Sequence, residues 1–164
     1  MHPRQIKQGA RDAYTQWLSA EPWDYFLTLT DPGLSHPEAM YKRTRFFLNQ
    51  VNKDLYGNKW WKRTTGIEHV IGLERQTRGS VHSHTLFRLP HHDGSDPHVF
   101  NMKGWQTFAQ ELGGFAWLEP PQDSERTTRY VCKYVCKDGE IYISEGFNPS
   151  APQHYKHTLM GAEQ

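Results

Sequence analysis

Two alternating segments joined by a short connection, residues 68–74 and 81–89, constrain the fold more than any other feature of this sequence. Their sequences are EHVIGLE and VHSHTLFRL, and the connection QTRGS between them contains Gly79. Segments rich in β-branched and aromatic residues on both sides of a glycine-containing connection are typical of a β-hairpin. The pair therefore predicts an antiparallel part of a sheet.

The flanking segments predict further strands and helices. Residues 24–30 (DYFLTLT) and 115–119 (FAWLE) are short and rich in aromatic or β-branched residues, so both are expected to be strands. Helices are predicted where apolar residues recur at helical spacing or where start and stop residues bound a segment: 4–20, the segment opened by a capping box SHPE at 35–38, 101–112, and the segment that holds residues 130–137 and ends at Gly139.

The order of these elements predicts an α+β fold. We expect a central antiparallel sheet of about five strands, similar to HUH and RRM folds, with helices packed on one face and the other face left for chemistry. The chain of 164 residues fits one domain, 1–164, because no linker marks a second one. Its core is expected over about 24–143, followed by an irregular tail over about 145–164.

Charge and cysteine content exclude several classes of protein. The chain has 19 basic and 18 acidic residues, so it is not a generally polybasic nucleic-acid binder, and any such contact must come from a local patch. Cys132 and Cys136 do not suggest a disulfide framework or a zinc site. No apolar run or signal pattern points to a membrane, and we expect a cytoplasmic protein.

The stretch YVCKYVCK, residues 130–137, repeats a Tyr-x-x-Lys unit. On a helix, Tyr130 and Tyr134 lie on one face, about 6 Å apart along the axis. Lys133 and Lys137 fall close to the same face. The stretch is either a partly buried aromatic stripe with solvated lysines, or a pair of hydroxyl nucleophiles with a cation beside each.

A candidate metal site follows from the predicted hairpin. His82 and His84 are two residues apart on a strand, so both side chains point to one face. If QTRGS is the loop, Glu74 lies directly opposite His82 and Gly72 opposite His84. A slip of one residue would turn Glu74 to the other face. Two imidazoles and one carboxylate leave open positions on a divalent ion, although a surface Glu–His ion pair has the same pattern.

Other side chains are alternative metal ligands. Glu68 has the same strand parity as Glu74 but lies further along the strand. The histidines of the loop after residue 89 are more often solvated in such a context; they are His91, His92 and His98.

The ordered set of FLTLT, GLERQTRGSVHSHTLF and YVCKYVCK resembles the HUH endonucleases. More narrowly, it is similar to the two-tyrosine replication initiators (Rep proteins) that start rolling-circle replication in small single-stranded DNA phages and some plasmids. The resemblance covers roughly residues 24 to 137. It departs at Ser83, where the family has a bulky apolar residue; Ser83 faces away from the histidines, so the change should affect packing and not metal binding.

The resemblance implies a metal-dependent, site-specific single-stranded DNA endonuclease and strand transferase. A tyrosine hydroxyl, of Tyr130 or Tyr134, would attack a backbone phosphorus to give a 5′-phosphotyrosine link, on a helix that crosses the metal-bearing face. Glu74, His82 and His84 would hold Mg²⁺ or Mn²⁺, and Lys133 or Lys137 would stabilise the phenolate or phosphate. The implied partners are origin DNA and a separate helicase and polymerase of a bacterial host cell.

Substrate contacts are predicted from basic and aromatic residues. The stretch KWWKR suits backbone neutralisation and base stacking, and buried or dimer-contact tryptophans fit it equally well; its residues are Lys59, Trp60, Trp61, Lys62 and Arg63. Three further arginines are expected near the metal site: Arg75, Arg78 and Arg88. Thr28 and Thr30 are candidates to line it.

Two other functions stay open from the sequence. A relaxase or transposase of the same superfamily is one, although a relaxase would use an N-terminal tyrosine, for which Tyr14 is the nearest candidate. A non-catalytic single-stranded nucleic-acid binding module is the other. The origin sequence, the native metal, the oligomeric state and the first tyrosine to attack are left open too.

Overall fold

The computed structural model describes residues 3–21, 23–33, 36–89, 101–121, 124–135 and 140–145. Its helices are α1 (Pro3–Ser19), α2 (Pro37–Tyr56), α3 (Met102–Glu111) and α4 (Ser124–Val135), with a 3-10 turn η1 (Trp60–Lys62). Its strands are β1 (Tyr25–Asp31), β2 (Glu68–Arg75), β3 (Val81–Arg88), β4 (Phe115–Glu119) and β5 (Glu140–Ile143).

The strands form one five-stranded antiparallel sheet in the order β4-β1-β3-β2-β5. This confirms the predicted α+β fold. The β2–β3 hairpin has the predicted register, with Glu74 opposite His82 and Gly72 opposite His84. Its turn passes through Gly79 at a φ of 89°, a conformation that glycine adopts without the steric cost of a Cβ.

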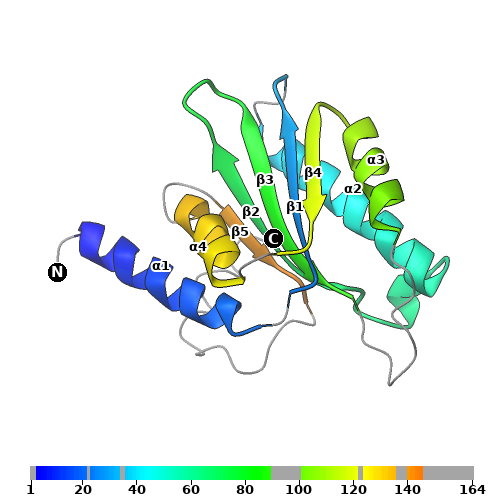
Figure 1. The fold of residues 1–164 in the computed structure, drawn as a ribbon, viewed down its shortest axis with the longest axis horizontal. Helices are drawn as coiled ribbons and strands as arrows, with labels where there is room; N and C mark the ends of the chain where they lie inside the picture. The colour runs from blue at the N-terminus through cyan, green and yellow to red at the C-terminus, as the bar shows by residue number, and fades with distance from the viewer. Residues whose placement is uncertain are drawn as a thin grey trace.

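Helices cover both faces of the sheet (Figure 1). One face packs against α2 and α3 through an apolar core that includes Leu29, Phe47 and Phe87. The other face packs against α4, and α1 lies against α4 on the same side. The second core includes Tyr14 and Val131. Sequence reasoning placed the Tyr-x-x-Lys helix on this face but did not foresee that α1 also lies there.

Two local predictions need correction. The residue that caps α2 is His36, whose side chain makes no capping hydrogen bond, so the SHPE capping box does not form in that way; Pro37 does stand in the first turn, where its missing N–H costs nothing. Strand β5 was not located in the sequence. Ile141 and Ile143 of β5 pack in or against the second core, and this alternation was the signal.

Cys132 is buried in the second core, as expected of a helix-packing residue. Cys136 and Lys137 lie outside the described residues, as does the predicted end of the helix at Gly139. Within the described ranges, no helix is both long enough and apolar enough to cross a membrane.

Candidate metal centre and nucleophile helix

Three side chains meet near the turn of the β2–β3 hairpin: Glu74, His82 and His84, here called the ligand cluster. Each offers one ligand atom, and these atoms all lie within 4.8 Å of one another. His84 Nε2 is 3.0 Å from Glu74 Oε2. Strand alternation puts both histidines on one face, and the hairpin register brings the carboxylate opposite His82. The three residues could therefore hold a metal ion, as the sequence predicts.

Neighbouring polar groups orient both imidazole rings. Thr28 of β1 lies opposite His84, and its Oγ1 is 3.4 Å from His84 Nδ1. Gln76 Nε2 is 3.2 Å from His82 Nδ1. Both contacts engage Nδ1, and second contacts of this kind fix ring orientation in protein metal sites. Thr30 lies opposite His82, so both threonines line the cluster, as expected.

The surroundings of the cluster favour neutral imidazole. Burial lowers the pKa of His82 from its usual range, and the neighbouring His84 lowers it further, against the opposing effect of Glu74. His84 itself is buried, with 2% of its surface exposed. Neutral imidazole is the form that binds a metal ion, and a carboxylate beside two imidazoles suits a divalent ion.

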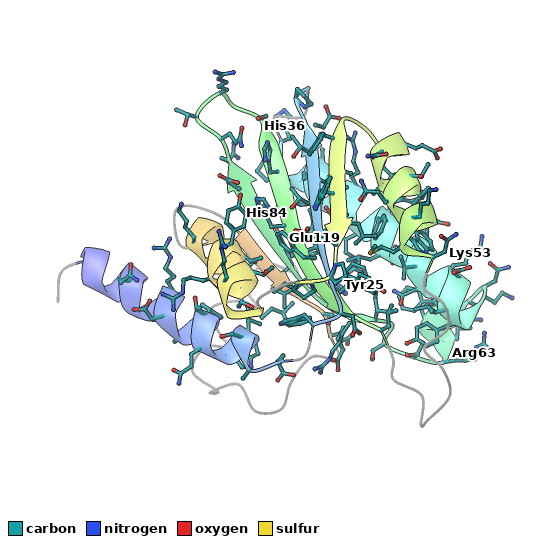
Figure 2. The ribbon with its side chains drawn as sticks, viewed as in Figure 1. Tyr25, His36, Lys53, Arg63, His84 and Glu119 are labelled. Atoms are coloured by element: carbon teal, nitrogen blue, oxygen red, sulfur yellow. The ribbon has the colours of Figure 1, made fainter. Side chains whose placement is uncertain are left out.

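Helix α4 brings Tyr130 against the ligand cluster (Figure 2). The Tyr130 ring stands edge-on to the His84 imidazole, with 5.2 Å between ring centroids and an interplanar angle of 87°. Phe26 completes this group: its ring is stacked with His84 at 6.1 Å and meets Tyr130 edge-on at 6.4 Å. Tyr130 remains 43% exposed. The predicted approach of the first tyrosine to the metal-bearing face is thus present in the fold.

The buried side of α4 explains where Tyr130 lies. Thr128, Val131 and Cys132 are completely buried, which sets the rotation of the helix and leaves Tyr130 at the margin of the buried stripe. Helix α1 secures α4 as well, because Arg11 Nη2 donates a hydrogen bond of 2.9 Å to the Lys133 carbonyl oxygen. The backbone of Tyr134 belongs to α4, one turn after Tyr130, while its side chain lies outside the described part of the chain.

A cavity of about 860 Å³ lies beside Tyr130, between α1 and α4. Four of its lining residues are basic: Arg11, Arg126, Arg129 and Lys133. The others are Gln8, Asp12, Thr15, Phe26, Glu119, Thr127 and Tyr130. Sequence reasoning missed this basic groove. The signal was the helical spacing of three of its cations relative to Tyr130, which could not be used without knowing that α1 forms the opposite wall.

The arginines predicted near the site lie in different surroundings. Arg88 shares the face of His84, as expected, but forms ion pairs with Glu68 and, at 2.6 Å, with Glu21. This group of Glu21, Glu68 and Arg88 is called the Arg88 cluster below. Two other predicted arginines are exposed: Arg75 at the end of β2, with strand parity opposite to Glu74, and Arg78 in the hairpin turn.

The KWWKR stretch is not brought to the ligand cluster. It forms η1 and the residues around it, and Trp60 meets Trp61 edge-on at 6.1 Å. This turn precedes the first residue of β2, whereas Glu74 is near the last, so the two are separated by about 20 Å of strand. Lys59, Lys62 and Arg63 are exposed.

The alternatives for the metal site fare differently. Glu68 belongs to the Arg88 cluster and not to the ligand cluster. The loop histidines lie outside the described residues: His91, His92 and His98. Ser83 is buried on the face opposite the histidines and is hydrogen-bonded at 2.8 Å to Thr44 of α2. The unusual residue between the histidines therefore affects packing, as predicted.

Comparison with known proteins gives one finding about kinship. The family model for the replication-associated protein ORF2 matches residues 24–139, more than half of the chain. The match includes the ligand cluster and Tyr130, and it begins after α1. Neither the search of curated proteins nor the search of solved structures gave a match.

Proposed function

Because the chain belongs to the replication-associated protein ORF2 family, we propose that it starts DNA replication by nicking and rejoining single-stranded DNA at an origin. The reaction would be metal-assisted and pass through a 5′-phosphotyrosine intermediate. One observation carries this proposal: the Tyr130 ring is 5.2 Å from the imidazole of His84, a member of the ligand cluster. A phenol beside a group of metal ligands is what a tyrosine nuclease requires.

The ligand cluster fits a divalent ion. Glu74, His82 and His84 would hold it, and the mixture of carboxylate and imidazole is compatible with Mg²⁺ or Mn²⁺. When bound, the ion supplies charge that polarises a phosphate oxygen. Thr28 and Gln76 hold the rings in place through Nδ1.

The nucleophile of the proposed first cleavage is Tyr130. Its Oη forms a bond to phosphorus as the bond from phosphorus to the 3′ oxygen breaks; the phenol loses its proton to solvent and the 3′ oxygen gains one. The number of phosphoester bonds is unchanged, so rejoining needs no ATP. A phenol with a pKa near 10 is a poor nucleophile unless it is aligned. Packing against His84 and Phe26 provides that alignment.

Tyr134 is proposed as the second nucleophile. It follows Tyr130 by one helical turn, about 6 Å along the axis. While one tyrosine holds the 5′ end of the DNA, the other can cut the newly completed origin. Lys133 and Lys137 would stabilise the phenolate or the phosphate at each step.

The basic groove between α1 and α4 supports binding of a DNA backbone beside Tyr130. Its four cations suit phosphate neutralisation. Arg75, Arg78 and the KWWKR stretch remain proposed contacts with more distant DNA. The proposal also includes a separate helicase and polymerase of the host cell.

A relaxase that uses an N-terminal tyrosine is not favoured by the structure. Tyr14 is buried in the second core, packed between elements of the metal-bearing face. A buried phenol cannot reach a DNA phosphate without local unfolding. A non-catalytic binding module would leave the approach of Tyr130 to the ligand cluster without a purpose.

Trapping the covalent intermediate tests the proposal. The protein is incubated with Mn²⁺ and single-stranded DNA labelled at the 3′ end, because a 5′-phosphotyrosine retains the downstream strand. We expect an adduct on denaturing gels that mass spectrometry maps to Tyr130. Tyr134→Phe should still form it, and the double change to Phe should form none. An adduct on Tyr14, Tyr41 or Tyr142, with none on Tyr130 or Tyr134, would overturn the mechanism.

A further inference from the structure

The metal-bearing face of the sheet continues past the ligand cluster to β1 and β4. In the observed register, Thr28 of β1 pairs with His84 on one side and with Trp117 of β4 on the other. Directly paired residues in a sheet share a face. His84, Thr28 and Trp117 therefore form a row across three strands on the side of the ligand cluster. The parallel row toward the hairpin turn consists of His82, Thr30 and Phe115.

Phe115 and Trp117 are exposed to an unusual degree for large aromatic residues in a sheet. Their exposed fractions are 61% and 51%. The residues between and after them, Ala116 and Leu118, point the other way and are buried in the first core. Strand β4 thus places its small apolar residue inside and its two largest apolar side chains outside. Folding does not require that arrangement, since an antiparallel strand with one solvated face ordinarily carries polar residues there.

The position of the two aromatic residues connects them to the site. Neighbouring strands are about 4.8 Å apart, so the β4 side chains stand about 10 Å from the histidines across β1. That distance corresponds to about three stacked nucleotide steps of 3.4 Å. Helix α4, in contrast, contacts β2 and β3. A strand held at Tyr130 that extends toward β4 would bring its bases over Trp117 and Phe115.

We propose that Phe115 and Trp117 form a stacking platform for the bases of single-stranded DNA next to the cleaved phosphate. The inference rests on the proposed function for the identity of the strand. Every base has an aromatic face, so a platform of this kind binds without strong sequence preference. It also selects single strands, because the base faces in a duplex are already covered by neighbouring bases. Continuity with the ligand cluster favours this occupant over a second copy of the chain.

Binding without cleavage tests the platform. The wild-type protein in EDTA is titrated against a fluorescent dT oligonucleotide, and the dissociation constant is compared with those of Phe115→Ala and Trp117→Ala. We expect each change to weaken binding by about 5- to 100-fold, the range for loss of one base–aromatic stack. Trp117→Tyr should restore most of the affinity. The matched control is Phe46→Ala, which removes an aromatic side chain that is 48% exposed on α2, and it should bind as the wild type does.

Three outcomes bear directly on the platform. Unchanged affinity of both alanine variants for single strands would overturn it, and so would equal weakening for a duplex. A dimer in sedimentation that Trp117→Ala dissolves, with DNA affinity unchanged, would identify the face as an interface between copies and would also overturn it. Photocrosslinks from 5-iodouracil that map to Phe115 or Trp117 would support it.

The test separates this inference from the proposed nicking. If no protein variant ever forms a covalent adduct but the alanine changes weaken single-strand binding, the platform stands and the nicking proposal fails. If adducts form on Tyr130 with affinity independent of Trp117, the nicking proposal stands and the platform fails.

Discussion

The β2–β3 hairpin carries charged side chains on one face at both of its ends, and the two ends are built differently. Near the turn, Glu74 lies opposite His82 and meets His84. At the other end of the same strands, Glu68 lies opposite Arg88 and forms an ion pair with it. Both carboxylates have the same strand parity, so parity alone cannot distinguish a metal ligand from a structural ion pair.

The residue across the strand makes the distinction. In the Arg88 cluster, a guanidinium that is always charged neutralises Glu68 and Glu21 permanently. In the ligand cluster, the residues opposite the carboxylate are imidazoles, which carry charge only when protonated. A carboxylate between neutral imidazoles is suited to a cation from solution, whereas a carboxylate beside arginine already has one. Changes at the two ends of the hairpin should therefore affect different properties.

Loss of both imidazoles should abolish cleavage. In the variant His82→Ala with His84→Asn, adduct formation with Mn²⁺ should fall below detection, because the cluster retains only one charged ligand. Asparagine is used at position 84 because His84 is buried and alanine would leave a cavity. Circular dichroism should show a retained fold, and EDTA should have the same effect on the wild type. Full nicking in EDTA would contradict the metal assignment.

Acid should weaken the end of the hairpin that holds the Arg88 cluster. His69, next to Glu68, is buried, and burial lowers its pKa from 6.5 to about 4, with a smaller effect from Arg45 and an opposing hydrogen bond to the Ile67 carbonyl oxygen. The unfolded chain therefore takes up a proton that the folded chain refuses. Stability is complete above pH 6.5 and is lost as the pH falls toward 4, by on the order of 3 kcal/mol.

Urea unfolding at several pH values between about 7.5 and 4.5 measures this loss. The control is His69→Gln, whose stability should vary less with pH over the same window even if it is lower throughout. Equal pH dependence in the two proteins would mean that another group titrates.

Removal of each carboxylate should affect a different property. Glu74→Gln should weaken Mn²⁺ binding by about 10- to 100-fold, or about 1.4 to 2.7 kcal/mol, because it removes the charged ligand. Glu68→Gln should leave Mn²⁺ affinity unchanged. Isothermal titration calorimetry with both proteins measures the difference, and the reverse ranking would show that the ligand cluster is wrongly assigned.

Loss of the guanidinium should reduce stability and leave metal binding intact. Arg88→Met leaves Glu21 and Glu68 without their shared cation, and we expect unfolding free energy to fall by about 1 to 2 kcal/mol in these partly exposed positions. Adding Glu68→Gln should cost less than the two single changes combined, because the residues are coupled. Strict additivity in urea unfolding would indicate that the ion pair contributes nothing.

The hairpin could be predicted from the sequence because its determinants are local. The length of QTRGS and the alternation of side chains fix the register, and the register alone brings Glu74 to His82. The spacing of Tyr130 from its buried neighbours could also be read as one face of a helix. These features involve residues that are near in sequence or directly paired.

The features that the sequence did not reveal depend on contacts between distant elements. The approach of Tyr130 to His84 requires α4 to pack across β2 and β3 at one particular rotation. The basic groove needs Arg11 of α1 to face α4, and nothing near Arg11 in the sequence indicates that neighbour. Strand β5 is only Glu140–Ile143, too short for its alternation to stand out.

The hydrogen bond from Arg11 to the Lys133 carbonyl oxygen has a consequence for how two tyrosines can take turns. It clamps the middle of the repeat to α1, which lies outside the segment that matches the family. A helix held in this way acts as a fixed rail. The traffic between Tyr130 and Tyr134 then falls to the nucleic acid, which has to advance about 6 Å, roughly two stacked nucleotides, while the protein stays still.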